Sequence, residues 1–334
     1  MNEVSVEGEC RRSLVIPVYR NEENIPSLME ALTALNHDLG GDLEVICVVD
    51  GSPDRSGEQL IEAGRTAAFP LRVVFHSRNF GSFTAIRTGM EFAGGANVAV
   101  MAADLQEPPE LIHRFFTMLE ADEADVVFGQ RSGRHDAWLR DALSNAFWAL
   151  YRKLVIPDLP RGGVDIFACN RPAVQAVLQI EEPNSSLVAQ LFWIGFRRRF
   201  VPYHRRQRQH GTSAWNLTRR MRYMMDSIFS FTDLPILLVL WFGILGCIAS
   251  LLIGGGIATA RLVGLIQEPG YAGLAVLITF SASATLAVQG VIGSYLWRTF
   301  ENTKRRPLRL VSRIVNNRDP APKLAAPTSM ERYA

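Results

Sequence analysis

The sequence carries a compact pair of oxygen-bearing side chains directly after a short apolar run. Asp104 and Gln106 lie two residues apart, just past the apolar segment 97–101, which is typical of a buried strand. A carboxylate and a carboxamide at a strand end can hold a hard divalent cation, Mg²⁺ or Mn²⁺, together with a diphosphate. Pro108 and Pro109 then end the loop and start a helix. The alternative is an ordinary strand-to-helix turn with an acidic cap.

Similar polar clusters follow each of the first four predicted strands. Apolar or β-branched runs alternate with helix-like segments, which predicts a mainly parallel sheet covered by helices on both faces. The predicted strands are 13–18, 43–49, 71–75, 98–101 and 125–128, and the predicted helices are 25–35, 56–67, 82–93 and 109–120. The polar clusters at the strand ends are 19–24, 50–54, 77–79 and 104–106. Ligands of such sheets bind at the carboxyl ends of the strands, so four clusters converging there favour a site.

Two common nucleotide-binding motifs are missing from the sequence. The first predicted strand is not followed by a glycine-rich dinucleotide turn, and no GxxxxGK[ST] phosphate loop is present. A nucleotide bound at this edge would therefore be held by side chains and a cation.

Charge is distributed very unevenly along the 334 residues, which have a formal net charge of +2. No charged residue occurs in 234–260 or in 270–297, and each stretch exceeds the roughly 20 residues that a membrane-spanning helix needs. Arginines and lysines concentrate before the first stretch and after the second, which predicts that both termini are cytoplasmic. Residues 1–13 contain no apolar signal region, and the four cysteines show no metal-ligand spacing.

The sequence is predicted to divide into four parts. They are a cytoplasmic α/β domain (1–200), juxtamembrane amphipathic helices (201–232), a two-helix transmembrane hairpin (233–298) and a cytoplasmic C-terminal tail (299–334). Segment 217–231 is typical of a basic helix in the membrane interface, and the alternative is a helix packed on its own domain. Small residues at 254–256 and 281–284 favour homo-oligomerisation through the spans.

Taken in order, the motifs resemble those of family 2 glycosyltransferases, which have a GT-A fold. They are IPVY (16–19) with EEN (22–24), DGSPD (50–54), RNFG (78–81), DLQEPPE (104–110), GQR (129–131), GVD (163–165) and an RxxRxxGxSxW pattern (205–215). Within the family they are similar to the polyprenyl-phosphate glycosyltransferases, which include the dolichyl-phosphate mannose synthases and the bacterial GtrB- and ArnC-type enzymes. The paired C-terminal stretches fit the bacterial branch.

This resemblance implies transfer of a sugar from a nucleoside diphosphate sugar to polyprenyl phosphate at the cytoplasmic face of the plasma (bacterial inner) membrane. By analogy with the bacterial branch the donor is a UDP-sugar and the acceptor undecaprenyl phosphate, in cell-envelope polysaccharide or lipopolysaccharide modification. The implied partners are membrane lipid, a flippase and a downstream glycosyltransferase, and no nucleic acid is expected. A phosphate monoester has its second pKa at about 6, so the acceptor is largely dianionic at neutral pH and needs no general base.

Each motif receives a role under this interpretation. The predicted catalytic residues are Asp104, Arg131 and Asp165, and Asp104 and Gln106 are predicted to bind the metal and the diphosphate. The residues predicted to bind the donor are Pro17, Tyr19, Glu22, Asp50 and Asn79. Those predicted to bind the acceptor phosphate or a lipid headgroup are Arg131, Arg134, Arg205, Arg208 and Ser213. Asp165 would orient the sugar or an arginine, and its alternative is a structural role. For Arg205 and Arg208 the alternative is a solvated basic face.

Two positions depart from the family's pattern. Val49 stands where the family has the first of two acidic residues, and Ala102 stands where it has the first aspartate of an Asp-x-Asp motif. Magnesium commonly uses one or two protein carboxylates with substrate phosphates and water, so weaker rather than abolished metal binding is expected. These departures motivate one rival interpretation, a pseudoenzyme that scaffolds a membrane glycosylation complex. The other rival, a polysaccharide synthase, would have more spans and a QxxRW motif, and the sequence has neither.

Overall fold

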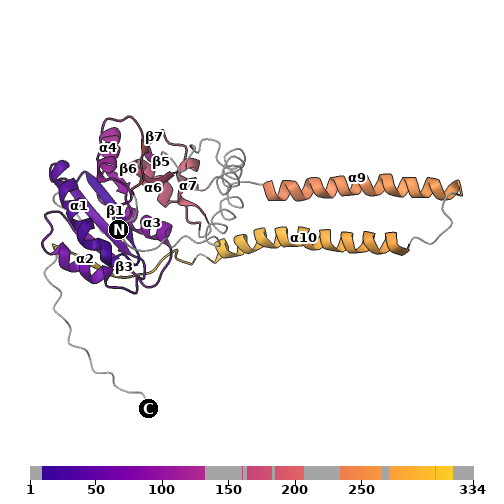
Figure 1. Cartoon of the computed structure of the whole chain (residues 1–334), viewed down its shortest axis with the longest axis horizontal. Coiled ribbons are helices and arrows are strands. Elements are labelled where there is room, and N and C mark those ends of the chain that lie inside the picture. Colours follow the sequence, from indigo (N-terminus) through magenta and orange to yellow (C-terminus); the bar gives the residue numbers. More distant parts are fainter. Residues whose placement is uncertain are drawn as a thin grey trace, which may run out of the picture.

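The computed structural model consists of an α/β domain from which two long helices project (Figure 1). It describes residues 10–131, 160, 164–182, 185–206, 234–264, 271–304 and 306–318. The predicted interfacial segment 217–231 lies outside these residues.

The domain is built on one mixed sheet of eight strands in the order β7-β5-β6-β4-β1-β2-β3-β8. The strands are β1 (Arg12–Val18), β2 (Leu43–Val49), β3 (Leu71–His76), β4 (Asn97–Val100), β5 (Val126–Arg131), β6 (Val164–Asn170), β7 (Arg198–Tyr203) and β8 (Val311–Asn316). Parallel pairing joins β1 to β2 and β4, β2 to β3, and β5 to β7, and the remaining pairs are antiparallel. The five predicted strands and the mainly parallel sheet are confirmed, while β6, β7 and β8 were not predicted.

Helices cover both faces of this sheet, as the alternating pattern predicts. They are η1 (Glu22–Asn24), α1 (Ile25–Asp38), α2 (Ser56–Gly64), α3 (Ser82–Phe92), α4 (Pro109–Glu120), α6 (Arg171–Leu178) and α7 (Leu187–Trp193). One core packs α1, α2 and α4 on the first face, and a second core packs α3, α6 and α7 on the other. Helix α3 lies flush on β1, because a Cβ at Gly89 would meet Val15 Cγ1 at 2.2 Å. The central strands are buried on both faces, which explains their nearly continuous apolar sequences.

Asp125 ties together the ends of three strands on the β7 side of the sheet. Its carboxylate accepts hydrogen bonds from Arg197 Nε (3.0 Å), the Arg197 backbone N–H (3.0 Å) and Asn170 Nδ2 (2.9 Å). The hydrogen bonds from the Arg197 side chain, together with the backbone bond and its positive charge, hold the pKa of Asp125 below its ordinary value despite partial burial.

We expect Asp125→Asn to lower the melting temperature at pH 7 and to have a smaller effect at pH 3. A carboxylate with a depressed pKa in the folded state stabilises the fold above its unfolded pKa of about 3.9, and this contribution is lost as the pH falls through the folded value. Thermal unfolding of both proteins at the two pH values measures the difference. An equal loss at pH 3 and pH 7 would contradict the ionic role.

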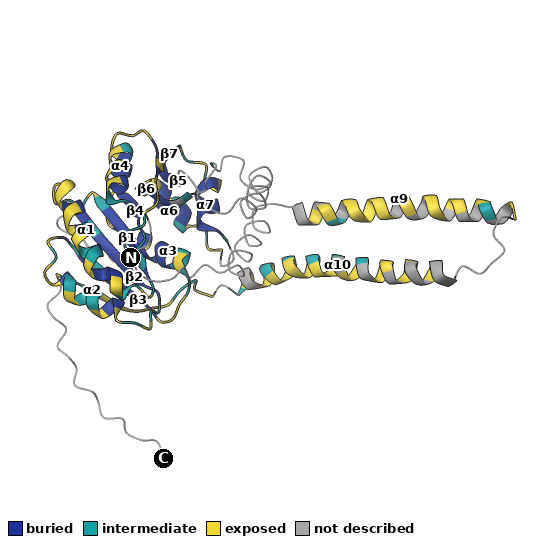
Figure 2. Cartoon of the chain, in the orientation of Figure 1, coloured by how far each residue is buried: buried dark blue, intermediate teal, exposed yellow. Residues whose placement is uncertain are grey.

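The two charge-free stretches form the long helices α9 (Leu234–Leu262) and α10 (Tyr271–Thr303), which run antiparallel away from the domain (Figure 1). Large apolar side chains are exposed along them, among them Leu252 (72% exposed) and Leu286 (68%), whereas the interior of the domain is buried (Figure 2). Over the described residues, no helix combines the length and the hydropathy that crossing a membrane requires.

The segment after α10 is part of the sheet rather than a simple tail. Strand β8 pairs antiparallel with β3 at the edge of the sheet. The Asn317 side chain then accepts from Leu71 N (3.0 Å) and donates to the carbonyls of Gly64 (3.1 Å) and Phe69 (2.9 Å), and Arg309 forms an ion pair with Glu91 of α3. Residues 306–318 lie within the predicted tail at 299–334. These residues fasten the end of α10 to the domain.

Candidate functional site

The sheet has a topological switch point between β1 and β4. From β1 the chain continues to β2 and β3 on one side, whereas β4 pairs with β1 on the other side. In open α/β sheets, ligands bind outside the carboxyl ends of the two strands that meet at such a point. Tyr19 follows β1 and Asp104 follows β4, so two of the predicted site residues flank the switch point.

The remaining strands bring further predicted site residues to the same edge. Strand β5 runs parallel to β4, because both are antiparallel to β6, and Arg131 therefore ends β5 at the edge that holds Asp104. Strand β6 runs the opposite way and begins at this edge, which places Asp165 there. Strand β7 is parallel to β5, so His204 and the residues after it arrive at the same edge. The topology thus gathers the predicted catalytic set.

Arg205 packs directly against the Asp104–Gln106 corner. Its Nη2 donates to Gln106 Oε1 at 2.5 Å, and its Nε lies 3.8 Å from a carboxylate oxygen of Glu107, whose side chain is 2% exposed. The backbone N–H of Arg206 also donates to the carbonyl of Gln106 at 2.8 Å. The sequence assigned Arg205 to lipid or acceptor and did not foresee this contact. A guanidinium at this corner adds positive charge where an anion would bind.

The corner offers oxygen donors of the kind that Mg²⁺ and Mn²⁺ prefer. Asp104 is 8% exposed, and its Oδ1 accepts from the backbone N–H of Gln106 at 3.3 Å. Among the residues that the structure describes, no group of three or more His, Cys, Asp or Glu side chains is placed to hold a metal ion. One carboxylate and one carboxamide do fit a cation that is shared with a diphosphate and water.

The loops after β1 and β2 are joined by a network centred on Asp54, which the sequence analysis did not single out. Asp54 accepts from the hydroxyls of Ser52 (2.6 Å) and Ser56 (2.8 Å) and from the backbone N–H of Glu22 (3.1 Å). Glu22, predicted to hold the nucleoside, accepts from the backbone N–H of Arg55 at 3.0 Å. The Ser-x-Asp-x-Ser spacing at 52–56 is the sequence signal for this network. This network fixes the shape of the sheet edge beside the switch point.

The other predicted donor residues lie in or just after strands β1, β2 and β3. Pro17 is inside β1, Asp50 is buried at the end of β2, and Asn79 is exposed in the loop after β3. Of the predicted acceptor residues, Arg134, Arg208 and Ser213 lie outside the described residues.

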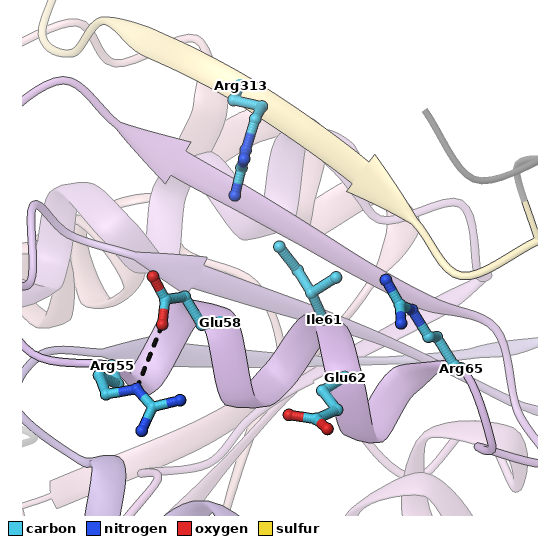
Figure 3. Close-up of a pocket in the computed structure, with 6 residues that line it drawn as sticks. All are labelled: Arg55, Glu58, Ile61, Glu62, Arg65 and Arg313. Atoms are coloured by element: carbon cyan, nitrogen blue, oxygen red, sulfur yellow. Dashed lines mark hydrogen bonds and ion pairs between the residues drawn. The ribbon is translucent and has the colours of Figure 1, made fainter. Parts of the chain in front are cut away.

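A separate surface pocket lies between α2 and β8 and contains none of the predicted site residues (Figure 3). It is lined by Arg55, Glu58, Ile61, Glu62, Arg65 and Arg313. Arg55 Nε lies 3.3 Å from a Glu58 carboxylate oxygen. Because none of the predicted site residues lines it, this pocket is not the candidate site.

Gly51 holds the β2 and β3 loops in contact. It has a φ of +59°, and a Cβ there would lie 2.3 Å from the carbonyl carbon of Arg78. We expect Gly51→Ala to cost about 1–3 kcal/mol of stability through overpacking. Gly40 is the matched control, because its φ is also positive, at +73°, while a Cβ there meets nothing within 4 Å. Chemical denaturation measures both variants, and equal losses would show that φ alone matters.

Comparison with known proteins agrees with this geometry. The family model described as "Glycosyl transferase family 2" matches residues 13–230, which include the edge just described. The chain belongs to this family. It is therefore a glycosyltransferase that uses nucleotide sugars, with a GT-A-like α/β domain.

Two curated relatives extend the similarity over most of the chain. The uncharacterized glycosyltransferase sll0501 of Synechocystis sp. is 33% identical over 301 residues, which cover 90% of this chain and 94% of that protein. The glycosyltransferase CsbB of Bacillus subtilis is 32% identical over 299 residues, 90% of each chain. Among solved structures, the mannosyltransferase PcManGT from Pyrobaculum calidifontis in complex with GDP-Man and Mn²⁺ matches with a TM-score of 0.48 at 17% identity, over 86% of this chain and 87% of that chain.

Proposed function

We propose that this glycosyltransferase transfers a sugar from a nucleoside diphosphate sugar, with a UDP-sugar favoured, to polyprenyl phosphate at the cytoplasmic face of a membrane. In this proposal α9 and α10 form a transmembrane hairpin, and the α/β domain and both termini are cytoplasmic. The product is a polyprenyl-phosphate sugar.

The observation that carries the proposal is the attachment of a long apolar hairpin to a nucleotide-sugar domain. The sequence of α9 is free of charged residues over 234–260, and that of α10 over 271–297. The hairpin is followed by β8, which pairs with β3 at the edge of the domain's sheet. An acceptor whose chain is buried in lipid would present its phosphate at the base of such a hairpin. The guanidinium groups of Arg131 and Arg205, at the sheet edge that holds Asp104, support an anionic acceptor.

Arg131 is proposed to receive the acceptor phosphate. It ends β5 at the edge that holds Asp104, and a guanidinium can donate two parallel hydrogen bonds to phosphate oxygens. Arg205, which contacts Gln106, lies where it could neutralise charge on the donor diphosphate. Asp165, the second residue of β6, lies at the same edge and would orient the sugar or an arginine.

The proposed step needs few catalytic groups. An oxygen of the dianionic acceptor phosphate attacks the anomeric carbon of the sugar, and the bond from that carbon to the donor phosphate oxygen breaks. The nucleoside diphosphate leaves with the bonding electrons. Asp104 and Gln106 would hold a divalent cation, which when bound supplies positive charge to the departing diphosphate. The chain's own residues bring two anions together and orient them.

The test is a transfer assay with the purified full-length protein in nanodiscs. Polyprenyl phosphate, Mg²⁺ or Mn²⁺, and a panel of radiolabelled UDP- and GDP-sugars are supplied, and label in the organic phase is counted. We expect transfer from one donor, lost on addition of EDTA and restored by the metal. Transfer that survives EDTA would overturn the metal assignment. A folded protein that transfers label from none of the donors would overturn the proposal and favour the scaffold.

A further inference from the structure

Three buried polar side chains connect the ends of β2 and β3 to helix α3. Asp50 is 2% exposed, His76 is 4% exposed and Thr88 is fully buried. Asp50 Oδ1 lies 2.8 Å from His76 Nδ1, and His76 Nε2 lies 2.9 Å from the Thr88 hydroxyl. A carboxylate only accepts hydrogen bonds, so Nδ1 of the imidazole donates to Asp50. The imidazole is thus fixed at both nitrogens.

The same carboxylate holds the loop that leads into α3. Asp50 Oδ1 accepts from the backbone N–H of Phe80 at 2.8 Å, and Oδ2 accepts from the backbone N–H of Gly81 at 2.7 Å. The Phe80 ring packs edge-on against His76, with ring centroids 5.4 Å apart. The Arg78 guanidinium lies 4.0 Å from the centroid of the Phe80 ring on the exposed side of the loop. Residues 78–81, the β3–α3 loop, therefore take their position from Asp50 and His76.

We infer that Asp50 and His76 are positioning residues, which set the β3–α3 loop against the donor site and thereby control affinity for the nucleoside diphosphate. The inference rests on the proposed binding of the donor at this edge. It replaces the direct nucleoside contact that the sequence suggested for Asp50, because that carboxylate is buried and already accepts three hydrogen bonds.

The position of the loop explains why its placement affects the donor. It follows β3 at the carboxyl edge of the sheet and packs on the turn after β2, where Gly51 approaches the Arg78 backbone closely. That turn is joined to the loop after β1, because the Arg20 backbone N–H donates to the Ser52 hydroxyl at 2.8 Å. A shift of the β3–α3 loop therefore alters the surface on the β2 side of the switch point. The Asp104 corner follows β4, which lies on the other side of β1 from β2 and β3.

The test compares variants that remove different contacts of one network in the full-length protein in nanodiscs. Glutamine places its amide near the Nε2 position of histidine and asparagine near the Nδ1 position, so His76→Gln loses the bond to Asp50 and His76→Asn keeps it. Asp50→Asn replaces an acceptor by a donor opposite backbone N–H groups. Thr88→Val removes the partner of His76 Nε2, together with the hydrogen bond from the Thr88 hydroxyl to the Thr84 carbonyl (2.9 Å), and keeps the shape of the side chain. His37→Gln is the matched control, since the His37 side chain is 91% exposed.

Binding of UDP and of GDP is measured by calorimetry. For each variant we also measure kcat, the KM values for donor and acceptor, and the melting temperature. We expect Asp50→Asn and His76→Gln to raise the Kd of the bound nucleotide by at least about tenfold, as loss of a buried charge-assisted hydrogen bond predicts. Acceptor KM and kcat should stay within about twofold, and His76→Asn and His37→Gln should bind nearly as well as the wild type.

Each other outcome overturns the inference in a recognisable way. A raised Kd in Asp50→Asn alone would mean that Asp50 contacts the nucleotide itself. Lower melting temperatures with an unchanged Kd would mean a purely structural network, and Thr88→Val and His76→Gln give this answer even if Asp50→Asn does not fold. A wild type that binds neither UDP nor GDP would also overturn it. A wild type that binds nucleotide but transfers no sugar to polyprenyl phosphate would overturn the proposed function alone.

Discussion

Asp104→Asn is expected to reduce turnover by about 10²–10³-fold, the range found when one preorganised electrostatic group is removed from an active site. The substitution keeps the size of the side chain and an oxygen that can accept from the Gln106 backbone N–H. It removes the negative charge that a divalent cation needs, and Ala102 leaves no second aspartate in the motif to replace it. The melting temperature should therefore stay close to that of the wild type while kcat falls.

The measurement is kcat in nanodiscs at several Mg²⁺ concentrations. Asp38→Asn on α1 is the control, because that side chain is 68% exposed and distant from the strand ends of the site. The reciprocal variant Ala102→Asp restores the carboxylate that the family carries, and it should lower the Mg²⁺ concentration needed for half-maximal rate. Full activity in Asp104→Asn would remove this residue from the metal site.

The edge of the sheet that forms the site could be predicted because its signals are local. A strand such as 43–49 is nearly all apolar, since it is buried on both faces, and a polar cluster directly after it lies at the strand's carboxyl end whatever the rest of the chain does. The alternation of such strands with helices was enough to place Tyr19 and Asp104 at one edge. The family motifs then supplied the chemistry.

The missed strands have weak local signals for a physical reason. Strand β7 is an edge strand with two arginines and Pro202, and a proline is tolerated only where its missing N–H is not needed by a neighbour. Strand β8 is the opposite edge, and Arg313 lies in its middle with the guanidinium 4.3 Å from the centroid of the Phe75 ring. Edge strands are half-exposed, so they do not show the continuous apolar pattern of the central strands.

The partners of the site residues could not be predicted, because they depend on how distant segments pack. Arg205 and Gln106 are 99 residues apart and meet only because β7 is parallel to β5. Likewise, Asp50 was assigned to the nucleoside from its motif, whereas the structure surrounds it with His76 and the backbone of the β3–α3 loop. A motif identifies which residues matter, and tertiary packing decides what each of them touches.

Arg131→Ala is expected to raise the KM for polyprenyl phosphate by about 10–100-fold and to change the KM for the donor by less than about twofold. A hydrogen bond between charged groups contributes about 1.5–3 kcal/mol, and each 1.4 kcal/mol is a factor of ten in affinity. Arg131→Lys should recover only part of the loss, because an ammonium group cannot donate the paired bonds of a guanidinium. Steady-state kinetics with each substrate varied in turn measures the difference.

The split between the two KM values is what identifies the acceptor site. Arg114→Ala, at an exposed position on α4, removes the same charge from the same domain and should change neither value. If the loss in Arg131→Ala came from a general fall in positive potential, high salt would reduce the wild-type affinity for both substrates to a similar degree. A bidentate contact at the end of β5 is less sensitive to salt and acts on one substrate. Equal effects on donor and acceptor would place Arg131 at the shared diphosphate and move the acceptor phosphate elsewhere on this edge.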